Sequence, residues 1–598
     1  MFRPRAVVPP EQRSELTLSP FQRRRLDGSW VLPFRDSILP LIDEHAFAQF
    51  FHASFGAPNR SIATVVGILL LKEFFDLTDE EALECFAFDL RWHIALDLVD
   101  QKVSCCQKTL HNFRALLRQH DKARQLFEQL TDRLISLLDL DTTHQRLDST
   151  HCKSNFAPLK RLGIFCETIR LFLRRLQRHE QGTAYASLPE QLRLRYHSGR
   201  GNKSRYHGAA SEVGRRRLAV VARDLFRLVQ RFEPDKEVAA WPEFAALKRV
   251  LAEQCEVLEL PQQPLPDDDD LALGAVSVRL REPKMVPSDS LQTPHDPDAT
   301  YGKKGQGHEV QVCETFGNKS EEEPDKPELI THVEVTPSCK SDINYTVPII
   351  KDLKQRGIQP EQLETDSNFT SSEVVKQARE LGTDLNGPVM GSKDLPGPGE
   401  VTVGDFMVDF KDPSNSRCPA GQPLSKQTVH EPAVQQAVGE TPGQQAVVPM
   451  RRVSLAVIAT VCLSCELAAA CPAKEGKGKH KGERVVRTSE EDLICEQRRR
   501  YETTDQFKER QAWRAGAEAT NSELKRAHGL GKLKVRGAGR VKAAVYLKTL
   551  GCNVKRVAVY LGKKAQRAKS KTRAEATAAA REPDQTREDG CLDTNPGS

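Results

Sequence analysis

The chain of 598 residues is 38% hydrophobic and 28% charged, which are globular values, and its length allows two to four domains. Fifteen cysteines stand at irregular spacing and no apolar signal segment follows Met1, so we expect reduced thiols rather than a disulfide framework. The most apolar run, residues 453–470, contains Glu466, which argues against a membrane span. These features favour a soluble cytoplasmic protein over the secreted and membrane classes.

The net charge of +6 is distributed unevenly along the chain. From Lys474 to the end there are 30 Lys and Arg residues against 17 Asp and Glu residues, a surplus of 13, so the preceding part is net −7. Phosphate contacts dominate the affinity of proteins for nucleic acids, so a basic C-terminal segment suits a nucleic-acid channel. The tail, residues 564–598, is instead expected to be disordered, with its charge solvated.

Residues 50–138 read as successive amphipathic helices, and we expect a helical N-terminal domain over residues 1–140. Ser61 and Thr78 are the expected N-caps of two of these helices. A later helix, residues 109–120, carries several basic side chains. They are compatible with DNA recognition and equally with a plain helical bundle, in which Arg and Lys only confer solubility.

Two aspartates belong to segments that read as strands. Asp148 lies in His-Gln-Arg-Leu-Asp-Ser-Thr-His, where small hydroxyl neighbours leave room for an ion. Asp366 ends a short strand, and Ser371 or Ser372 can cap the helix that follows. An acid at the C-terminal end of a buried strand, with a helix after it, is a common place for catalysis. Taken singly, each aspartate would be interpreted as a cap or turn residue.

Long insertions separate the candidate acids. Residues from about 164 to 255 have helical periodicity and many arginines, which predicts a helical insertion that is either DNA-facing or simply basic and amphipathic. Residues 261–298, including Asp267–Asp270, are rich in Pro and Asp and predict a flexible acidic linker. Residues from about 395 to 485 predict a small β-rich insertion, because Thr402–Phe410 alternates apolar and polar residues as a strand does.

A third acid, Glu518, lies on a predicted helix, with Arg514 four residues before it and Lys525 seven residues after it. At helical spacing these side chains share roughly one face. A carboxylate with flanking cations suits a site that holds a metal ion against a phosphodiester. A lone Glu on a helix is more often solvated, so the three acids carry weight only as a set.

Four cysteines form a separate pattern. Cys418 begins Cys-Pro-Ala-Gly-Gln, Cys462 and Cys465 form a Cys-x-x-Cys pair, and Cys471 follows. A thiolate pair separated by two residues is the usual half-site for tetrahedral zinc. The interval before Cys462 is long, so the set is either a structural zinc site or four unligated cysteines.

These segments together resemble the DDE transposases of bacterial insertion sequences. Residues 511–525 resemble the family signature Y-x2-R-x3-E-x6-K, although Gln511 takes the place of Tyr. Residues 296–304 resemble the run DP-x-A-x-x-G-x-K, and residues 553–556 resemble the closing N-x-K-R. A second departure is Asn368, where relatives usually have Gly. Similar cysteine sets occur in the insertion of this transposase branch.

The resemblance implies an α/β fold with a ribonuclease-H-like catalytic core over residues 141–563, a helical N-terminal domain, and the helical and β-rich insertions. It implies that Asp148, Asp366 and Glu518 hold two divalent ions, Mg²⁺ or Mn²⁺. Arg514 and Lys525 would then bind phosphate beside the scissile bond. The implied activity is DNA cleavage and strand transfer at the ends of an insertion sequence.

The implied partner is double-stranded DNA, both element ends and target, bound by a dimer acting at the nucleoid. We expect further DNA contacts from basic residues after the Glu518 helix, namely Lys532, Lys534, Arg536 and Arg540. Two alternatives stay open. One is a DNA-binding protein derived from the same transposase family that no longer cleaves DNA, and the other is a metal-dependent nuclease without strand transfer.

Overall fold

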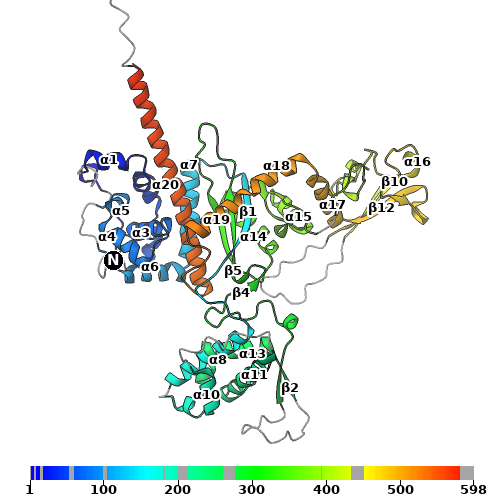
Figure 1. Ribbon diagram of the computed structural model, residues 1–598. Helices are drawn as coiled ribbons and strands as arrows, with labels where there is room; N and C mark the ends of the chain where they lie inside the picture. Colours follow the sequence, from blue (N-terminus) through cyan, green and yellow to red (C-terminus); the bar gives the residue numbers. More distant parts are fainter. Residues whose placement is uncertain are drawn as a thin grey trace, which may run out of the picture.

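The computed structural model describes residues 2–579 except for 6–7, 14–17, 53–54, 56–59, 99–103, 180–181, 198–211, 260–275, 392–393 and 432–449. Figure 1 shows a mixed sheet at the centre, N-terminal helices on one side of it, and two insertions that project away from it. Within these described ranges, no helix combines the length and the apolar character needed to cross a bilayer.

The N-terminal part is helical, as the sequence predicts. The Ser61 hydroxyl accepts a hydrogen bond from the Thr64 amide at 3.2 Å, and Thr78 forms a capping box with Glu81, so both expected caps are confirmed. The α-helices of this part are α1 (Pro20–Leu26), α2 (Val31–Pro33), α3 (Ile62–Phe74), α4 (Asp79–Phe88), α5 (Leu90–Ala95), α6 (Gln107–Gln119) and α7 (Lys122–Leu138).

The central sheet mixes antiparallel and parallel pairing. β5 runs antiparallel to β1, β4 and β6, whereas β7 runs parallel to both β1 and β8. Helix α14 (Ile343–Gln355) connects β6 to β7, and α15 (Ser372–Leu381) connects β7 to β8. This arrangement agrees with the predicted α/β class. The strands are β1 (His144–Cys152), β4 (Thr300–Gly302), β5 (Gly305–Thr315), β6 (Ile330–Pro337), β7 (Gln362–Glu364) and β8 (Asp384–Asn386).

One long helix, α20 (Ala538–Ala579), joins the N-terminal helices to the sheet. It packs against α3, α7 and β6, and Figure 1 shows it passing between the N-terminal helices and the strands. Apolar side chains from all three parts, such as Phe127, Leu147 and Val557, belong to one buried cluster. The helical N-terminal part is therefore continuous with the core of the sheet.

The end of α20 differs from the predicted tail. The helix continues to Ala579, whereas the composition of residues 564–598 predicts a disordered segment. Ala, Lys and Arg are strong helix formers, and the preceding turns are already fixed, so the helix can propagate without forming a new nucleus. Residues 580–598 lie outside the described residues.

The helical insertion forms a second core, below the sheet in Figure 1. Its apolar cluster includes Phe165, Phe172 and Phe244. The predicted acidic linker is only partly described: Asp267–Asp270 lies outside the described residues, and Val276–Leu280 is a strand rather than a linker. The elements are α8 (Arg161–Arg178), α9 (Thr183–Ala186), α10 (Glu190–Tyr196), α11 (Glu212–Phe232), α12 (Lys236–Ala239), α13 (Pro242–Gln254), β2 (Cys255–Glu259) and β3 (Val276–Leu280).

The second insertion contains a four-stranded antiparallel sheet. The strand predicted at Thr402–Phe410 is wrong. Thr402 and Asp405 form a capping box around a 3-10 turn, so side-chain hydrogen bonds satisfy the backbone that a sheet would otherwise pair. The elements here are β9 (Lys426–His430), β10 (Arg452–Ile458), α16 (Ala459–Cys462), β11 (Lys474–Glu475) and β12 (Glu483–Ser489), and the chain returns to the sheet through α17 (Glu490–Glu502), α18 (Asp505–Arg514) and α19 (Gly516–Ala527).

Candidate active site

Asp148 lies in β1, and Asp366 lies just beyond the end of β7, the parallel neighbour of β1. Arg146 of β1 pairs with Glu364 of β7, and each aspartate lies two residues further along the chain. Asp366 begins the 3-10 turn that follows β7, and its charge acts on Asp148, so the two carboxylates lie near each other. Burial raises the pKa of Asp148, and the nearby charge of Asp366 raises it further.

Three kinds of contact hold the Asp148 carboxylate in place. Its Oδ1 accepts a hydrogen bond from the Ser149 amide at 2.8 Å, and its Oδ2 accepts one from Asn521 Nδ2 at 2.9 Å. The charges of Arg514 and Lys304 lower the pKa of Asp148, against the effect of burial. Asp148 is therefore a partly desolvated carboxylate facing cations, an environment that favours binding of positive charge.

Asp366 caps the 3-10 turn Ser367–Phe369. Its Oδ1 accepts a hydrogen bond from the Asn368 amide at 2.8 Å, and its Oδ2 accepts one from Asn368 Nδ2 at 3.1 Å. Asn368 is one of the two departures from the family pattern, and here its side chain contacts the candidate carboxylate directly. The departure therefore adds a hydrogen bond that orients Asp366.

Helix α19 carries Glu518 across the sheet. Glu518, Asn521 and Lys525 are separated by three and four residues, so they form one stripe along the helix. Asn521 contacts Asp148, which directs this stripe to the aspartates. The Glu518 carboxylate itself is 67% exposed and pairs with Arg514 at 3.2 Å. The structure thus brings Asn521, one turn after Glu518, to Asp148, while the Glu518 side chain is turned to Arg514.

The charges of Arg514, Lys304 and Lys525 all interact with Asp148, and of these three Lys304 is not predicted from the sequence. Partial desolvation and the charge of Lys304 lower the pKa of Lys525, and the charge of Asp148 opposes this effect. Lys304 lies in the tight turn between β4 and β5, and its Nζ donates to the Ser149 carbonyl oxygen at 3.1 Å. Sequence reasoning missed Lys304 and Asn521 as site residues. Two sequence signals could have identified them. Lys304 is the final Lys of the DP-x-A-x-x-G-x-K run, and Asn521 follows Glu518 by three residues, which places it on the same helix face.

A buried charge network fixes α19 to the sheet and to α20. Glu314 of β5, whose side chain is 1% exposed, accepts hydrogen bonds from Arg146 Nε at 2.8 Å, Thr520 Oγ1 at 2.7 Å and Arg556 Nη1 at 3.2 Å. Arg556 also pairs with Glu523 of α19 at 2.7 Å. Arg556 is the last residue of the N-x-K-R motif, so the motif positions the Glu518 helix rather than contacting the acids.

The first residue of α19, Gly516, approaches β1 closely. A Cβ atom there would lie 1.9 Å from Arg146 Nη1, which donates to the Trp513 carbonyl oxygen and cannot move freely. We expect Gly516→Ala to lower the free energy of unfolding by about 1–3 kcal/mol, the usual cost of overpacking. Gly531→Ala is the matched control, since its Cβ would make an ordinary 3.6 Å contact with Lys525. Equal urea midpoints for the two variants would contradict this prediction.

The segment after α19 presents the predicted basic residues to solvent. The Lys153 amide donates to the Gly531 carbonyl oxygen, and the Leu533 amide donates to the Lys153 carbonyl oxygen, so the segment lies along the end of β1. Leu533 is buried, and the residues around it point outward. The exposed cations are Lys532, Lys534, Arg536 and, at the start of α20, Arg540. Extended pairing explains this alternation.

The four insertion cysteines are half-buried and lie near one another. Burial raises the pKa of the Cys462 thiol, Arg484 lowers it, and the thiols of Cys471, Cys418 and Cys465 raise it. Among the described residues, three ligand-type atoms lie within 4.8 Å of one another at Glu523, His528 and Cys552. Within that same part of the chain, neither the four thiols nor the three candidate acids form such a group.

The fold and the site define a mixed α/β protein with paired carboxylates and flanking cations. Residues 448–558 match the family model of the transposase DDE domain, a range that includes Arg514, Glu518 and Lys525. This match covers less than a fifth of the chain and supports a transposase DDE domain, a domain of the nuclease and transposase kind, in that part. The family implies a DNA substrate and generally uses divalent metal. Comparisons with curated proteins and with solved structures gave no match.

Proposed function

We propose that this protein is the transposase of a bacterial insertion sequence, which cleaves DNA at the element's ends and joins the ends to target DNA. The observation that carries the proposal is that Asp148 of β1 lies near Asp366, just beyond the end of the parallel strand β7, with Asn521 of the Glu518 helix bonded to Asp148. The strand order and mixed pairing are compatible with the ribonuclease-H-like core that the resemblance implies.

The donor set fits hard divalent cations. Asp148, Asp366 and Glu518 offer only carboxylate oxygens, the ligands that Mg²⁺ and Mn²⁺ prefer. An exposed ion pair contributes about 0–1 kcal/mol, so Glu518 can leave Arg514 at little cost and turn to the aspartates. Two bound ions would polarise the phosphodiester and lower the pKa of the attacking water or 3′-hydroxyl.

The positively charged side chains of the protein would bind the DNA backbone and position the scissile phosphate beside these acids. Arg514 offers a planar fork to a phosphate once Glu518 has turned away, and Lys525 and Lys304 offer point charges on either side of Asp148. Lys532, Lys534, Arg536 and Arg540 extend this basic surface along the outgoing chain. Two copies of the protein would be required to hold two element ends together.

The insertion cysteines are assigned a structural role. Cys418, Cys462, Cys465 and Cys471 would hold one Zn²⁺ ion, and each thiol would lose its proton on binding. The support for this is that all four are half-buried in one insertion and that the thiols of Cys471, Cys418 and Cys465 are near enough to Cys462 to raise its pKa. The site lies in the insertion, away from the aspartates, so it would stabilise the insertion's fold rather than take part in cleavage.

Strand transfer separates this proposal from the alternatives. The test supplies the protein with Mg²⁺, a pre-cut element end bearing a 3′-hydroxyl, and a supercoiled target plasmid. We expect joined products that Asp366→Asn abolishes. Cleavage of intact ends without joining would indicate a nuclease. Binding without either product would indicate an inactive DNA-binding protein. In that case the departures from the family pattern at Gln511 and Asn368 would be the first candidates for the cause of the lost activity.

Asn521 provides a second test of the proposed metal site, because its side-chain amide orients the Asp148 carboxylate and is not itself a proposed metal ligand. Hydrogen-bond partners of metal-binding carboxylates typically contribute 10–100-fold to metal affinity or activity. We therefore expect Asn521→Ala to lower the rate of end cleavage by about 10–100-fold, with a shift of the Mg²⁺ midpoint to higher concentration. Ser522→Ala, one residue along the same helix, should retain wild-type cleavage. An unchanged Mg²⁺ midpoint in Asn521→Ala would contradict the positioning role.

A further inference from the structure

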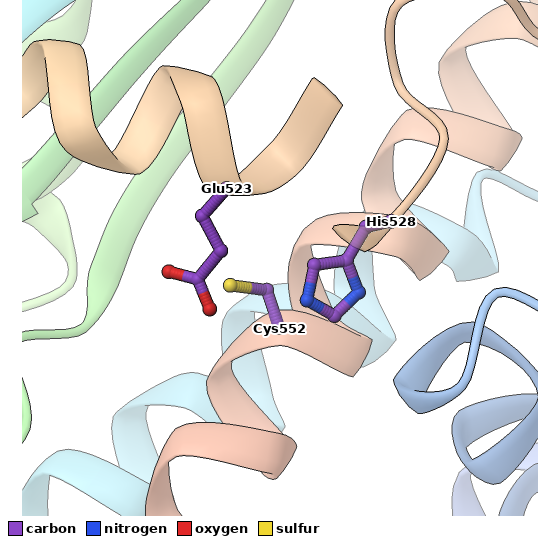
Figure 2. A group of neighbouring side chains, drawn as sticks. All are labelled: Glu523, His528 and Cys552. Atoms are coloured by element: carbon purple, nitrogen blue, oxygen red, sulfur yellow. The ribbon is translucent and has the colours of Figure 1, made fainter. Parts of the chain in front are cut away.

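A second cluster of metal-ligating side chains lies on the opposite side of α19 from the aspartates. Figure 2 shows Glu523 on α19, His528 just beyond its end, and Cys552 on α20, with the three side chains pointing toward one another. One ligand-type atom from each lies within 4.8 Å of the other two. His528 and Cys552 are fully buried, and the Glu523 side chain is 33% exposed.

The hydrogen bonding of His528 leaves one ring nitrogen as an available ligand. Its Nδ1 lies 2.8 Å from the Glu73 carbonyl oxygen, which can only accept, so Nδ1 carries the proton. In the neutral ring the lone pair is then on Nε2, and this buried atom has no hydrogen-bond partner among the residues that the structure describes. Burial is the main cause that lowers the pKa of His528, which keeps the ring neutral. An Nδ1–H bonded to a backbone carbonyl is also the usual support of a metal-binding histidine.

The other two side chains complete the donor set. Arg556 donates to Glu523 Oε2 from Nε at 3.1 Å and from Nη2 at 2.7 Å, which orients the carboxylate and leaves Oε1 as a ligand. Cys552 supplies a sulfur, and burial raises the pKa of its thiol to about 12, so it is protonated before any cation binds. A set of one sulfur, one imidazole nitrogen and one carboxylate oxygen is typical of Zn²⁺.

We propose that Glu523, His528 and Cys552 form a structural Zn²⁺ site that ties the end of α19 to α20. On binding, a Zn–S bond replaces the S–H bond of Cys552, and the proton leaves to solvent. A water molecule would fill the fourth position of the tetrahedron, because Glu523 Oε2 is occupied by Arg556. The site lies next to the turn that leads from the Glu518 helix to Lys532, so the bound ion fixes the path of the basic segment.

The test uses the full-length chain with Cys418, Cys462, Cys465 and Cys471 all changed to Ser, so that the insertion thiols cannot bind metal. The protein is stripped with a chelator under reducing conditions and titrated with Co²⁺ alone and with Zn²⁺ alone. We expect one equivalent of Co²⁺ with the visible spectrum of a tetrahedral ion and a thiolate charge-transfer band. Zn²⁺ should displace it and raise the midpoint of thermal unfolding.

Three variants decide the assignment. Cys552→Ala should abolish the charge-transfer band, and His528→Gln should weaken Co²⁺ binding at least about 10-fold, whereas Cys313→Ala, which removes another fully buried thiol, should change neither. A charge-transfer band that survives in Cys552→Ala, or its absence from the parent protein, would overturn the proposal.

If the parent protein with the four Ser substitutions fails to fold, zinc content is compared between the wild-type chain and single variants of it. In that background Cys552→Ala should contain one equivalent of zinc less than the wild type, and an unchanged zinc content would overturn the proposal. None of these readouts depends on DNA cleavage.

Discussion

Asp148→Asn is expected to abolish DNA cleavage and, at neutral pH, to raise the midpoint of thermal unfolding. Loss of one metal-binding carboxylate should lower the cleavage rate at least about 10³-fold, which corresponds to about 4 kcal/mol. The new amide can still hydrogen-bond Asn521, whose buried Oδ1 has no partner in the described part of the chain and can be turned toward it. The variant therefore loses charge but keeps its contacts.

The pH dependence of this stability gain follows from the raised pKa of Asp148. In the folded protein the pKa lies above its ordinary value of 3.8, chiefly because of burial, so the ionised carboxylate disfavours folding at neutral pH. As pH falls through the folded pKa toward 3.8, the wild type recovers stability, and the difference from Asp148→Asn should shrink. Thermal melts from pH 4 to 8 measure this difference. A destabilised variant at pH 7 would contradict the account.

Asp342→Asn is the matched control. Burial also raises the pKa of Asp342, which accepts hydrogen bonds from Ser149 Oγ at 3.0 Å and Gln311 Nε2 at 2.7 Å. This variant should show the same direction of stability change at neutral pH. Because Asp342 is outside the proposed acid set, its cleavage activity should remain. Loss of cleavage in both variants would mean that the three-acid assignment is incomplete.

Arg556→Met is expected to lower the free energy of unfolding by about 3–5 kcal/mol, the cost of leaving a buried charge without its partner. Arg556 donates to Glu314, Glu523 and Thr520, and its side chain is 15% exposed. Its loss leaves the buried Glu314 with Arg146 as its remaining cation, and it detaches α19 from α20. Urea unfolding, followed by circular dichroism, measures the effect.

Arg567→Met is the control on the same helix. Arg567 pairs with Asp325, but the two side chains are 57% and 35% exposed. Exposed pairs contribute about 0–1 kcal/mol, so this variant should unfold close to the wild type. Similar urea midpoints for Arg556→Met and Arg567→Met would show that the network around Glu314 does not hold the Glu518 helix.

The sequence predicts elements whose signals are local. The caps at Ser61 and Thr78 and the helical insertion need only periodicity and capping chemistry, and the structure has them where they are expected. The strand predicted at Thr402–Phe410 is wrong because alternation does not reveal that Thr402 and Asp405 bond each other's backbone. The helix beyond residue 564 is missed because composition alone does not show that α20 already supports it.

The residues of the candidate site likewise fall into those that the sequence marks and those that only the folded structure reveals. The family resemblance marks Asp148, Asp366 and Glu518 as candidates, and the structure adds that Asp148 lies in β1 and Asp366 just beyond the end of its parallel neighbour β7. Lys304 and Asn521 are missed, since they acquire meaning only when β5 and α19 are folded against β1. The same applies to the Arg556 network, whose partners are far apart in sequence.

The central claim is that Glu518 completes an active site with the two aspartates. The most direct measurement is cleavage, in Mg²⁺, of a DNA fragment that carries the element's own terminal repeats, by wild type and Glu518→Gln side by side. The account predicts cutting at the repeat boundary by the wild type, and binding without cutting by Glu518→Gln. Equal cutting by both proteins would contradict the account, because the exposed Glu518–Arg514 pair would then be only a surface contact.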